Sequence, residues 1–306
     1  MKVSIIGAGN VGGLLASRII DSHLADVTLI DIKEDIAKAK AADISDSLYF
    51  SKSPQKIIAT SDINQVEKSE IIVITAGFPR RAGMSREDLI AKNANLIKEI
   101  ATKIKSKLKD AIVIIVTNPL DLMVYYFKKL TQIDSKRLIG MGNSLDSARF
   151  ANLIASKFDK NINDINAQVI ASHGRGMLPL DRLTYVKDVS LAESATKEEI
   201  KTISDLTVER GAEIVSLYGS GSAYFAPSAA IFEIVKAIAK DEKKIICAAA
   251  YLKGEYGISD ICLGVPAKIG KSGIEEIITL ALNKEEEETL RLTAQTIKEL
   301  TKKLPH

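Results

Sequence analysis

After Met1 the sequence reads Lys2-Val3-Ser4-Ile5-Ile6-Gly7-Ala8-Gly9-Asn10-Val11-Gly12, which is its clearest indication of a fold. A short apolar run leads into three glycines spaced Gly-x-Gly-x-x-Gly, and a helix-forming stretch follows. Apolar runs of strand length return at 26–30, 56–60, 71–75, 111–117 and 137–140, with helix-like segments such as 12–22 and 89–108 between them. Several of these runs are continuously apolar, as in strands buried on both faces. The pattern predicts an α/β fold with a doubly wound parallel sheet covered by helices.

The alternation ends near Gly142, which predicts two domains, residues 1–142 and a mixed α+β domain over 143–306. Further elements are predicted as helices at 144–158, 196–218 and 227–240, strands at 166–171, 245–252 and 261–266, and a loop at 172–179. Thr196 and Glu199 have the spacing of a capping box. A C-terminal helix is predicted from the apolar face Leu290, Ala294, Ile297 and Leu300. The acidic run 285–288 is interpreted as the solvated start of that helix.

The composition excludes several classes of protein. The 306 residues carry 42 Lys and Arg against 39 Asp and Glu, and the net charge of +3 is too small by itself to indicate a nucleic-acid-binding role. Aromatic residues make up 5% and Trp is absent, so no platform for stacking bases is evident. The two cysteines, Cys247 and Cys262, form no CxxC pair, which argues against a metal site or a disulfide framework and favours the cytoplasm. No apolar run is long enough for a membrane span, and no signal peptide is expected.

The glycine-rich turn has the features of a pyrophosphate site. Gly7 permits a tight turn, Gly9 lets a phosphate approach the main chain, and Gly12 lets the helix pack closely on the strand. The N-terminus of the helix offers free N–H groups to the phosphates. Asp31 ends the second strand and is predicted to accept hydrogen bonds from a ribose, so that NAD is favoured over NADP. Lys33 keeps NADP open as an alternative, because its charge softens the repulsion of a 2′-phosphate.

A candidate acid–base centre lies in the second half. Of the three histidines, His173 stands in a glycine-rich loop directly after an apolar strand. Asp146 and Arg149 are spaced i,i+3, so they share one face of the predicted helix. We expect Asp146 to orient the His173 ring and Arg149 to bind a carboxylate through two parallel N–H bonds. The plainer alternatives are a structural histidine and a surface ion pair.

Two loops at the carboxyl ends of parallel strands complete the candidate site. The loop after the fourth strand carries Arg80, Arg81 and Arg86 together with a proline and glycines that suit a hinged lid, with a solvated basic loop as the alternative. After the fifth strand comes Asn118, which is predicted to contact both the substrate and the nicotinamide ribose. Its bond to Pro119 is a candidate cis peptide.

Taken in order and spacing, these motifs resemble the lactate/malate dehydrogenase family over nearly the whole chain. The motifs are Gly7 to Gly12, the lid with Arg80 and Arg86, Thr117-Asn118-Pro119, Leu145 to Phe150, and His173-Gly174. Within the family the chain looks most like malate dehydrogenases of the lactate-dehydrogenase-like group. Their lid, Pro-Arg-Lys-Pro-Gly-Met-Ser-Arg, matches residues 79–86, and their Gly-Ser-Ala-Tyr-Tyr-Ala-Pro loop matches residues 221–227.

The resemblance implies a reversible hydride transfer between malate and NAD. In this reaction His173 is the acid/base, Asp146 holds its imidazolium, Arg149 binds the carboxylate beside the reacting carbon, and Arg86 polarises the carbonyl. Arg80 matches the position that carries Arg in malate enzymes and Gln in typical lactate enzymes, so it is expected to bind the distal carboxylate. The cofactor-binding residues implied are Gly7, Gly9, Asn10, Val11, Gly12, Asp31, Asn93, Val116 and Asn118. A dicarboxylate substrate, no metal, and a homo-oligomer, either dimer or tetramer, are also implied.

Three departures from the family pattern stand out. Arg175 replaces an acidic residue two positions after the histidine, Ala171-Ser172 replaces a Gly-Gly or Gly-Glu pair, and Ala82 stands where Pro is common. Arg175 is expected to oppose protonation of His173. Two alternatives are kept: a dehydrogenase for another 2-hydroxy acid such as lactate, and a dinucleotide-binding sensor that has lost catalysis, which Arg175 motivates.

Overall fold

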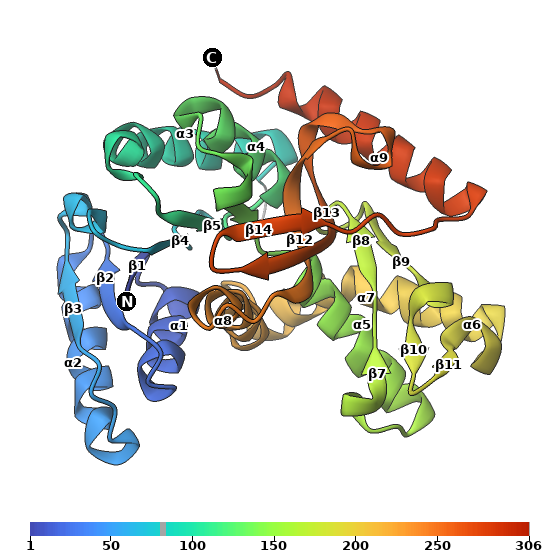
Figure 1. Cartoon of the computed structure of the whole chain (residues 1–306), viewed down its shortest axis with the longest axis horizontal. Helices are drawn as coiled ribbons and strands as arrows, with labels where there is room; N and C mark the ends of the chain where they lie inside the picture. Colours follow the sequence, from blue (N-terminus) through green and yellow to red (C-terminus); the bar gives the residue numbers. More distant parts are fainter. Residues whose placement is uncertain (80–83, 306) are drawn as a thin grey trace.

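The computed structural model describes residues 1–79 and 84–305, and one mixed sheet of eleven strands organises them (Figure 1). Six parallel strands form its first part, in the spatial order β3-β2-β1-β4-β5-β6. They are β1 (Lys2–Ile6), β2 (Asp26–Ile30), β3 (Ile57–Thr60), β4 (Ile71–Ile74), β5 (Ile112–Ile115) and β6 (Leu138–Gly140). This is the order of a doubly wound dinucleotide-binding fold, so the predicted fold class is confirmed.

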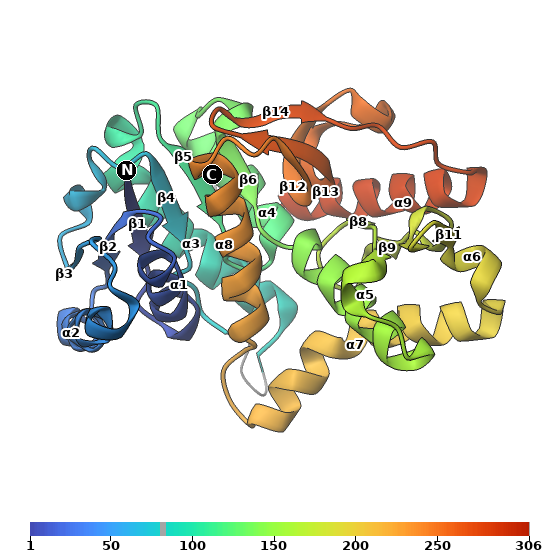
Figure 2. The ribbon, with the colours of Figure 1, turned by 60° about the horizontal axis from the view of Figure 1, so that its bottom comes forward.

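Helices cover both faces of the parallel sheet (Figure 2). Those of the first half are α1 (Asn10–Asp21), α2 (Glu34–Ser51), α3 (Arg86–Ile104) and α4 (Leu120–Thr131). One further helix, α8 (Phe225–Ala239), comes from the second half and packs on α1, where Arg18 Nε donates to Ser228 Oγ at 3.1 Å. The hydrophobic core of the sheet therefore takes side chains from both halves of the sequence.

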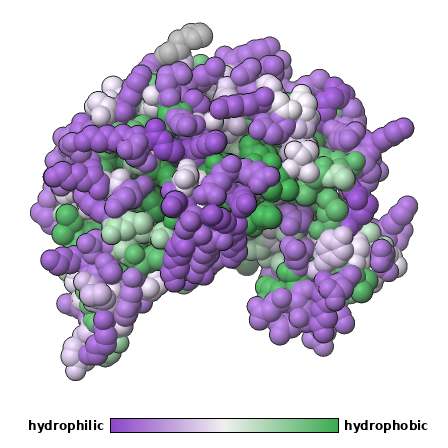
Figure 3. All heavy atoms as spheres, in the orientation of Figure 1, coloured by the Kyte–Doolittle hydropathy of each residue, from purple (hydrophilic) through white to green (hydrophobic). Residues whose placement is uncertain are grey.

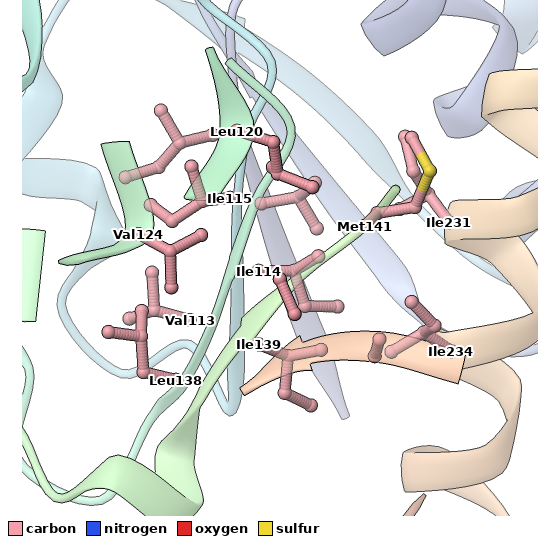
Figure 4. Close-up of a cluster of buried hydrophobic side chains, with 14 of the residues drawn as sticks. Val113, Ile114, Ile115, Leu120, Val124, Leu138, Ile139, Met141, Ile231 and Ile234 are labelled. Carbon is pink, nitrogen blue, oxygen red and sulfur yellow. The ribbon is translucent and has the colours of Figure 1, made fainter. Parts of the chain in front are cut away.

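The core around the central strands shows this arrangement directly (Figure 4). Ile114 and Ile139 lie in β5 and β6, with Val124 of α4 and Ile234 of α8 drawn on opposite sides of them. All four side chains are completely buried. Strands that are packed on both faces in this way explain the continuously apolar runs of the sequence.

The sheet does not stop at residue 142, because antiparallel strands extend it beyond β6. These are β12 (Lys244–Lys253), β13 (Ser259–Gly270), β8 (Val169–Ala171), β9 (Met177–Pro179) and β14 (Gly273–Ile277). A separate three-stranded sheet consists of β7 (Ile165–Asn166), β10 (Tyr185–Val186) and β11 (Val189–Ser190). The remaining helices are α5 (Asn143–Phe158), α6 (Leu191–Ser194), α7 (Lys197–Tyr218) and α9 (Lys284–Thr301).

Three predictions for the second half need correction. The single strand expected over 166–171 is two strands in different sheets, β7 and β8. The segment 172–179, expected to be a loop, contains β9, which turns back and pairs with β8. Pro179 fits there because it ends an edge strand, where a missing N–H leaves no ladder bond unmade. The acidic run 285–288 is not simply solvated, because Glu286 is buried and accepts a hydrogen bond from Arg182 Nη2 at 2.8 Å.

Capping boxes fix the residues at which two of the helices begin. The predicted capping box of α7 is present, with the Thr196 hydroxyl accepting from Glu199 N and the Glu199 carboxylate accepting from Thr196 N. The helix expected over 89–108 begins earlier, at Arg86, because Ser85 and Asp88 form a second capping box. The Asn118–Pro119 bond is cis, as predicted.

The face shown in Figure 3 is mainly hydrophilic, with apolar side chains in smaller groups between the charged ones. None of the helices in the described ranges is long and apolar enough to cross a membrane.

Candidate active site

The glycine turn after β1 has the close packing that its sequence predicts. Gly7 has φ 112°, and a Cβ on it would lie 2.6 Å from the Ala76 nitrogen. A Cβ on Gly12 would overlap the Gly7 carbonyl oxygen, so the turn closes only with glycine at both positions. A Cβ on Gly9 would meet nothing within 4 Å. The turn is therefore packed tightly on its inner side and open at Gly9.

The start of α1 lies beside this opening. Gly9 is the N-cap of α1 and provides no side chain to accept from the first N–H groups of the helix. Gly9 and Asn10 are exposed, and Val11 is partly buried. Free N–H groups at an exposed helix start are suited to bind an anionic group such as a pyrophosphate.

Asp31 lies next to the same turn, at the end of β2. Its Oδ2 accepts from Ala8 N at 2.7 Å, and its Oδ1 accepts from Lys33 N at 2.9 Å. Lys33 is exposed, whereas Lys40 donates from Nζ to Gly9 O of the turn at 2.8 Å. The lysine in contact with the turn is thus Lys40, which the sequence analysis did not single out.

The imidazole of His173 is held by Asp146. His173 Nδ1 donates to Asp146 Oδ2 at 2.7 Å, and Asp146 is completely buried. A carboxylate only accepts, so this bond assigns the proton to Nδ1. The side chain of His173 is 16% exposed, and within the described ranges its Nε2 has no hydrogen-bond partner. The ring is therefore oriented, with its second nitrogen free to exchange a proton.

Arg149 shares the same carboxylate. Its Nη1 lies 3.4 Å from Asp146 Oδ1, so Asp146 bridges the imidazole and the guanidinium. The Arg149 side chain is only 12% exposed, and its buried Nε has no partner among residues 1–79 and 84–305. Burial lowers the pKa of Arg149, which the Asp146 charge opposes. A buried guanidinium with unused donors is suited to bind a carboxylate.

The pKa of His173 is raised above its ordinary value of 6.5. Burial of the ring opposes protonation, but the charge and hydrogen bond of Asp146, together with the charge of Asp121, outweigh it. The cation that lowers this pKa is Arg149. Arg175, which we expected to oppose protonation, is exposed.

The loops after β4 and β5 are joined by Asn93 of α3. Asn93 is completely buried, and its Nδ2 donates to Asn118 O at 2.7 Å and to Phe78 O at 3.1 Å. Its Oδ1 accepts from Phe78 N at 2.8 Å. The side chain of Asn118 is exposed, and Val116 is partly buried. Asn93 thus positions the main chain of both loops.

The structure describes only one of the three arginines predicted to lie in the lid. Arg86 is the first residue of α3 and is exposed. Arg80, Arg81 and Ala82 lie outside the described residues, so the roles predicted for this part of the lid stay predictions. No group of His, Cys, Asp or Glu in the described part of the chain is arranged to hold a metal ion.

Around His173, Asp121 and the spatial role of Gly142 were missed by the sequence analysis, and Ala171 was noted only as part of a departure from the family pattern. Asp121 of α4 is buried and accepts from Ser172 Oγ and from the main-chain nitrogen of His173. A Cβ on Gly142 would lie 2.9 Å from the Cβ of His173, so glycine makes room for the ring. Ala171 has φ 70°, a conformation that favours glycine. The one signal for Asp121 was its place four residues after the fifth predicted strand.

These features define the class of the protein. The protein combines a doubly wound sheet, which has an open glycine turn, with an oriented imidazole beside a buried guanidinium. This is the arrangement of a dinucleotide-dependent oxidoreductase.

Comparison with known proteins identifies the family. Residues 1–140 match the lactate/malate dehydrogenase NAD binding domain, and residues 143–306 match the lactate/malate dehydrogenase alpha/beta C-terminal domain. A malate dehydrogenase from Methanosarcina barkeri is 41% identical, with 97% of each chain covered. The chain therefore belongs to the lactate/malate dehydrogenase family, and it is an NAD-dependent dehydrogenase.

Solved structures agree on the fold. The malate dehydrogenase from Aeropyrum pernix matches with a TM-score of 0.96 at 38% identity, covering 99% of this chain and 98% of its own. A lactate dehydrogenase from Cryptosporidium parvum, complexed with lactic acid and nicotinamide adenine dinucleotide, matches with a TM-score of 0.95 at 36% identity, covering 99% and 98%. Because both kinds of enzyme match almost equally well, the fold does not select the substrate.

Proposed function

We propose that this protein is an NAD-dependent malate dehydrogenase, which interconverts (S)-malate and oxaloacetate. The observation that carries the proposal is the bridge from His173 through Asp146 to Arg149, because it joins a proton-exchanging nitrogen to a carboxylate-binding cation. The curated relatives at about 40% identity, from Methanosarcina barkeri and Staphylococcus epidermidis, are both malate dehydrogenases.

The residues around the glycine turn fit a bound dinucleotide. The open side of Gly9 and the uncapped start of α1 suit the pyrophosphate, with Gly7, Gly12, Asn10 and Val11 shaping the turn. Asp31 would accept from the adenosine ribose, and its negative charge favours NAD over NADP. Asn118 and Val116 follow β5, and we propose that they contact the nicotinamide ribose. Asn93 supports this segment through its hydrogen bond to Asn118 O. When bound, the nicotinamide supplies or accepts the hydride.

The chain's own residues would handle the proton and the charge. His173 Nε2 takes the proton of the malate hydroxyl during oxidation and returns it to the carbonyl oxygen during reduction. This acid–base help from His173 is worth about 10²–10⁴ in rate. Asp146 stabilises the imidazolium between the two steps. Arg149 binds the carboxylate beside the reacting carbon. Arg86 stabilises the charge that develops on the oxygen once the lid is closed.

We assign to Arg80 the selection of a dicarboxylate over a monocarboxylate substrate. A second carboxylate at the distal end of the substrate needs a cation, and a methyl group there would leave a desolvated guanidinium unpaired. That costs roughly 1–3 kcal/mol, or about tenfold to a few hundredfold in selectivity. A dehydrogenase for lactate remains the second candidate, since a lactate dehydrogenase is among the matching structures.

The deciding experiment is a spectrophotometric panel of 2-oxo acids with NADH and NADPH. We expect oxaloacetate with NADH to be the preferred pair, and Arg80→Gln to shift preference towards pyruvate. Equal reduction of pyruvate and oxaloacetate by the wild-type enzyme would refute the role of Arg80. Absence of turnover with every acid, despite NADH binding, would favour a sensor. The homo-oligomeric state, the cytoplasmic location and the domain boundary at residue 142 stay predictions.

A further inference from the structure

Asp121 is a second buried carboxylate at the acid–base centre, beyond the Asp146 that the family resemblance implied. Its Oδ2 accepts from Ser172 Oγ at 2.7 Å and from the His173 main-chain nitrogen at 3.1 Å. Its Oδ1 is buried and has no hydrogen-bond partner among the described residues. A buried carboxylate oxygen without a partner is costly, which calls for a functional reason.

The fold brings the two carboxylates to His173 from neighbouring units of the sheet. Asp121 lies in the first turn of α4, which follows β5, and Asp146 lies in the first turn of α5, which follows β6. The positive end of each helix dipole favours a negative charge at these positions. His173 is therefore flanked by one carboxylate bound to its ring and another bound to its main chain.

The hydrogen bonds from Ser172 and His173 to Asp121 also fix a strained piece of main chain. Ala171 has φ 70° immediately before these two residues, and its carbonyl oxygen accepts from Asn143 Nδ2 at 3.1 Å. An alanine in this conformation persists only where its surroundings hold it. The Asp121 carboxylate is one of the groups that hold it, and so it helps to set the position of the imidazole.

We propose that Asp121 is a positioning residue for His173, which anchors the main chain at Ser172 and His173 and whose negative charge favours the protonated imidazole. This inference rests on the proposed function for its consequence in catalysis, but not for its effect on the ring itself. The protonated imidazole is the proton donor for 2-oxo acid reduction. Asp121 therefore tunes the pH range in which reduction is fast.

The charges around the pair are consistent with this role. Burial raises the pKa of Asp121 to about 6, while Ser172 and His173 act to lower it and Asp146 adds to the rise. The groups that face His173 are Asp121, Asp146 and the opposing cation Arg149. On the β13 side, the Cys262 thiol is buried with its pKa raised well above 9.0, so it stays uncharged and adds no charge to the centre.

The test is the titration of His173 by NMR in Asp121→Asn, measured without cofactor. The sequence has three histidines, and the signal that is lost in His173→Asn is assigned to His173. Asparagine keeps an oxygen that can accept from Ser172 and His173 but lacks the charge, so the His173 midpoint is expected at lower pH than in the wild type. Glu286→Gln is the matched control, because it removes a buried carboxylate that is paired with Arg182 instead. It should leave the midpoint in place.

Activity supplies a second readout. In Asp121→Asn the alkaline limb of oxaloacetate reduction should move to lower pH, with rates above the midpoint falling roughly three- to tenfold. The acidic limb of malate oxidation should move in the same direction, while the KM for NADH stays unchanged. A merely structural role would lower both rates without moving either limb.

If Asp121→Asn does not fold, Ser172→Ala tests the same idea. It removes the hydroxyl that helps to keep Asp121 ionised, so the His173 midpoint should move the same way by a smaller amount. An unmoved midpoint in every folded variant would overturn the role of Asp121, even if the enzyme reduces oxaloacetate. A moved midpoint in a protein that does not turn over oxaloacetate would uphold the effect on the ring and refute the proposed function alone.

Discussion

The glycine turn after β1 is one contiguous stretch that works through its main chain, whereas the centre around His173 collects ionisable side chains from α4, α5 and the β8–β9 connection. In the turn the deciding quantity is space, since a Cβ at Gly12 would overlap the Gly7 carbonyl oxygen. In the centre it is charge, since the carboxylates of Asp146 and Asp121 raise the pKa of His173 while Arg149 lowers it. The two regions should therefore respond to different kinds of substitution.

The largest difference is expected for His173→Asn. Loss of the proton-exchanging nitrogen should lower kcat by about 10²–10⁴, because general acid–base help has that size. The glycine turn is untouched, so the dissociation constant for NADH, measured by fluorescence titration, should stay within about twofold. Equal losses of turnover and of NADH binding would instead indicate a structural histidine.

The pH dependence of stability should distinguish Asp121→Asn from the wild type. The pKa of Asp121 is raised from 3.8 to about 6 in the folded protein, so its contribution to stability is complete below 3.8 and is lost as the pH rises through about 6. The full loss corresponds to about 3 kcal/mol. Asparagine does not titrate, so urea unfolding at pH 5 and pH 7.5 should show the variant gaining on the wild type at the higher pH. A difference that does not change with pH would contradict this account.

Within the turn, Gly12→Ala and Gly9→Ala form a matched pair. The Cβ at Gly12 overlaps the Gly7 carbonyl oxygen, so we expect a loss of about 1–3 kcal/mol in the free energy of unfolding, as for an overpacked core. The Cβ at Gly9 meets nothing, so thermal unfolding should be nearly unchanged while NADH binding weakens. If Gly9→Ala bound NADH as tightly as the wild type, the phosphates would not approach Gly9.

The smallest effect is expected for Asp31→Asn. The amide oxygen can still accept from one main-chain N–H, but the charge is gone, and a hydrogen bond to a charged group is worth about 1.5–3 kcal/mol against about 1 for a neutral one. NADH should bind roughly five- to tenfold more weakly, and the gap between NADH and NADPH should narrow. Lys33→Ala is the control, because it removes a nearby positive charge and should widen that gap. An unchanged ratio of the two affinities in both variants would remove Asp31 from cofactor selection.

Local sequence patterns predicted much of the fold and of the candidate site. The strand at 2–6, the glycine turn at 7–12 and the helix at 10–21 are short-range features. Their spacing alone predicts the fold and the proposed phosphate site. The Asp146 and Arg149 pair was also readable, because one helix turn separates them. The strand expected over 166–171 failed because two sheets divide it, and that division depends on partners far away in the sequence.

The doubly wound sheet, the glycine turn and the choice of His173 could all be predicted from residue order alone, because each signal lies in short stretches of neighbouring residues. The contact of Asp121 with His173, 52 residues later, and the space that Gly142 leaves for the ring arise from long-range packing. The same long-range packing places α8 of the second half against α1 of the first. Burial and charge act between surfaces, and a linear pattern does not record which surfaces the folded chain brings together.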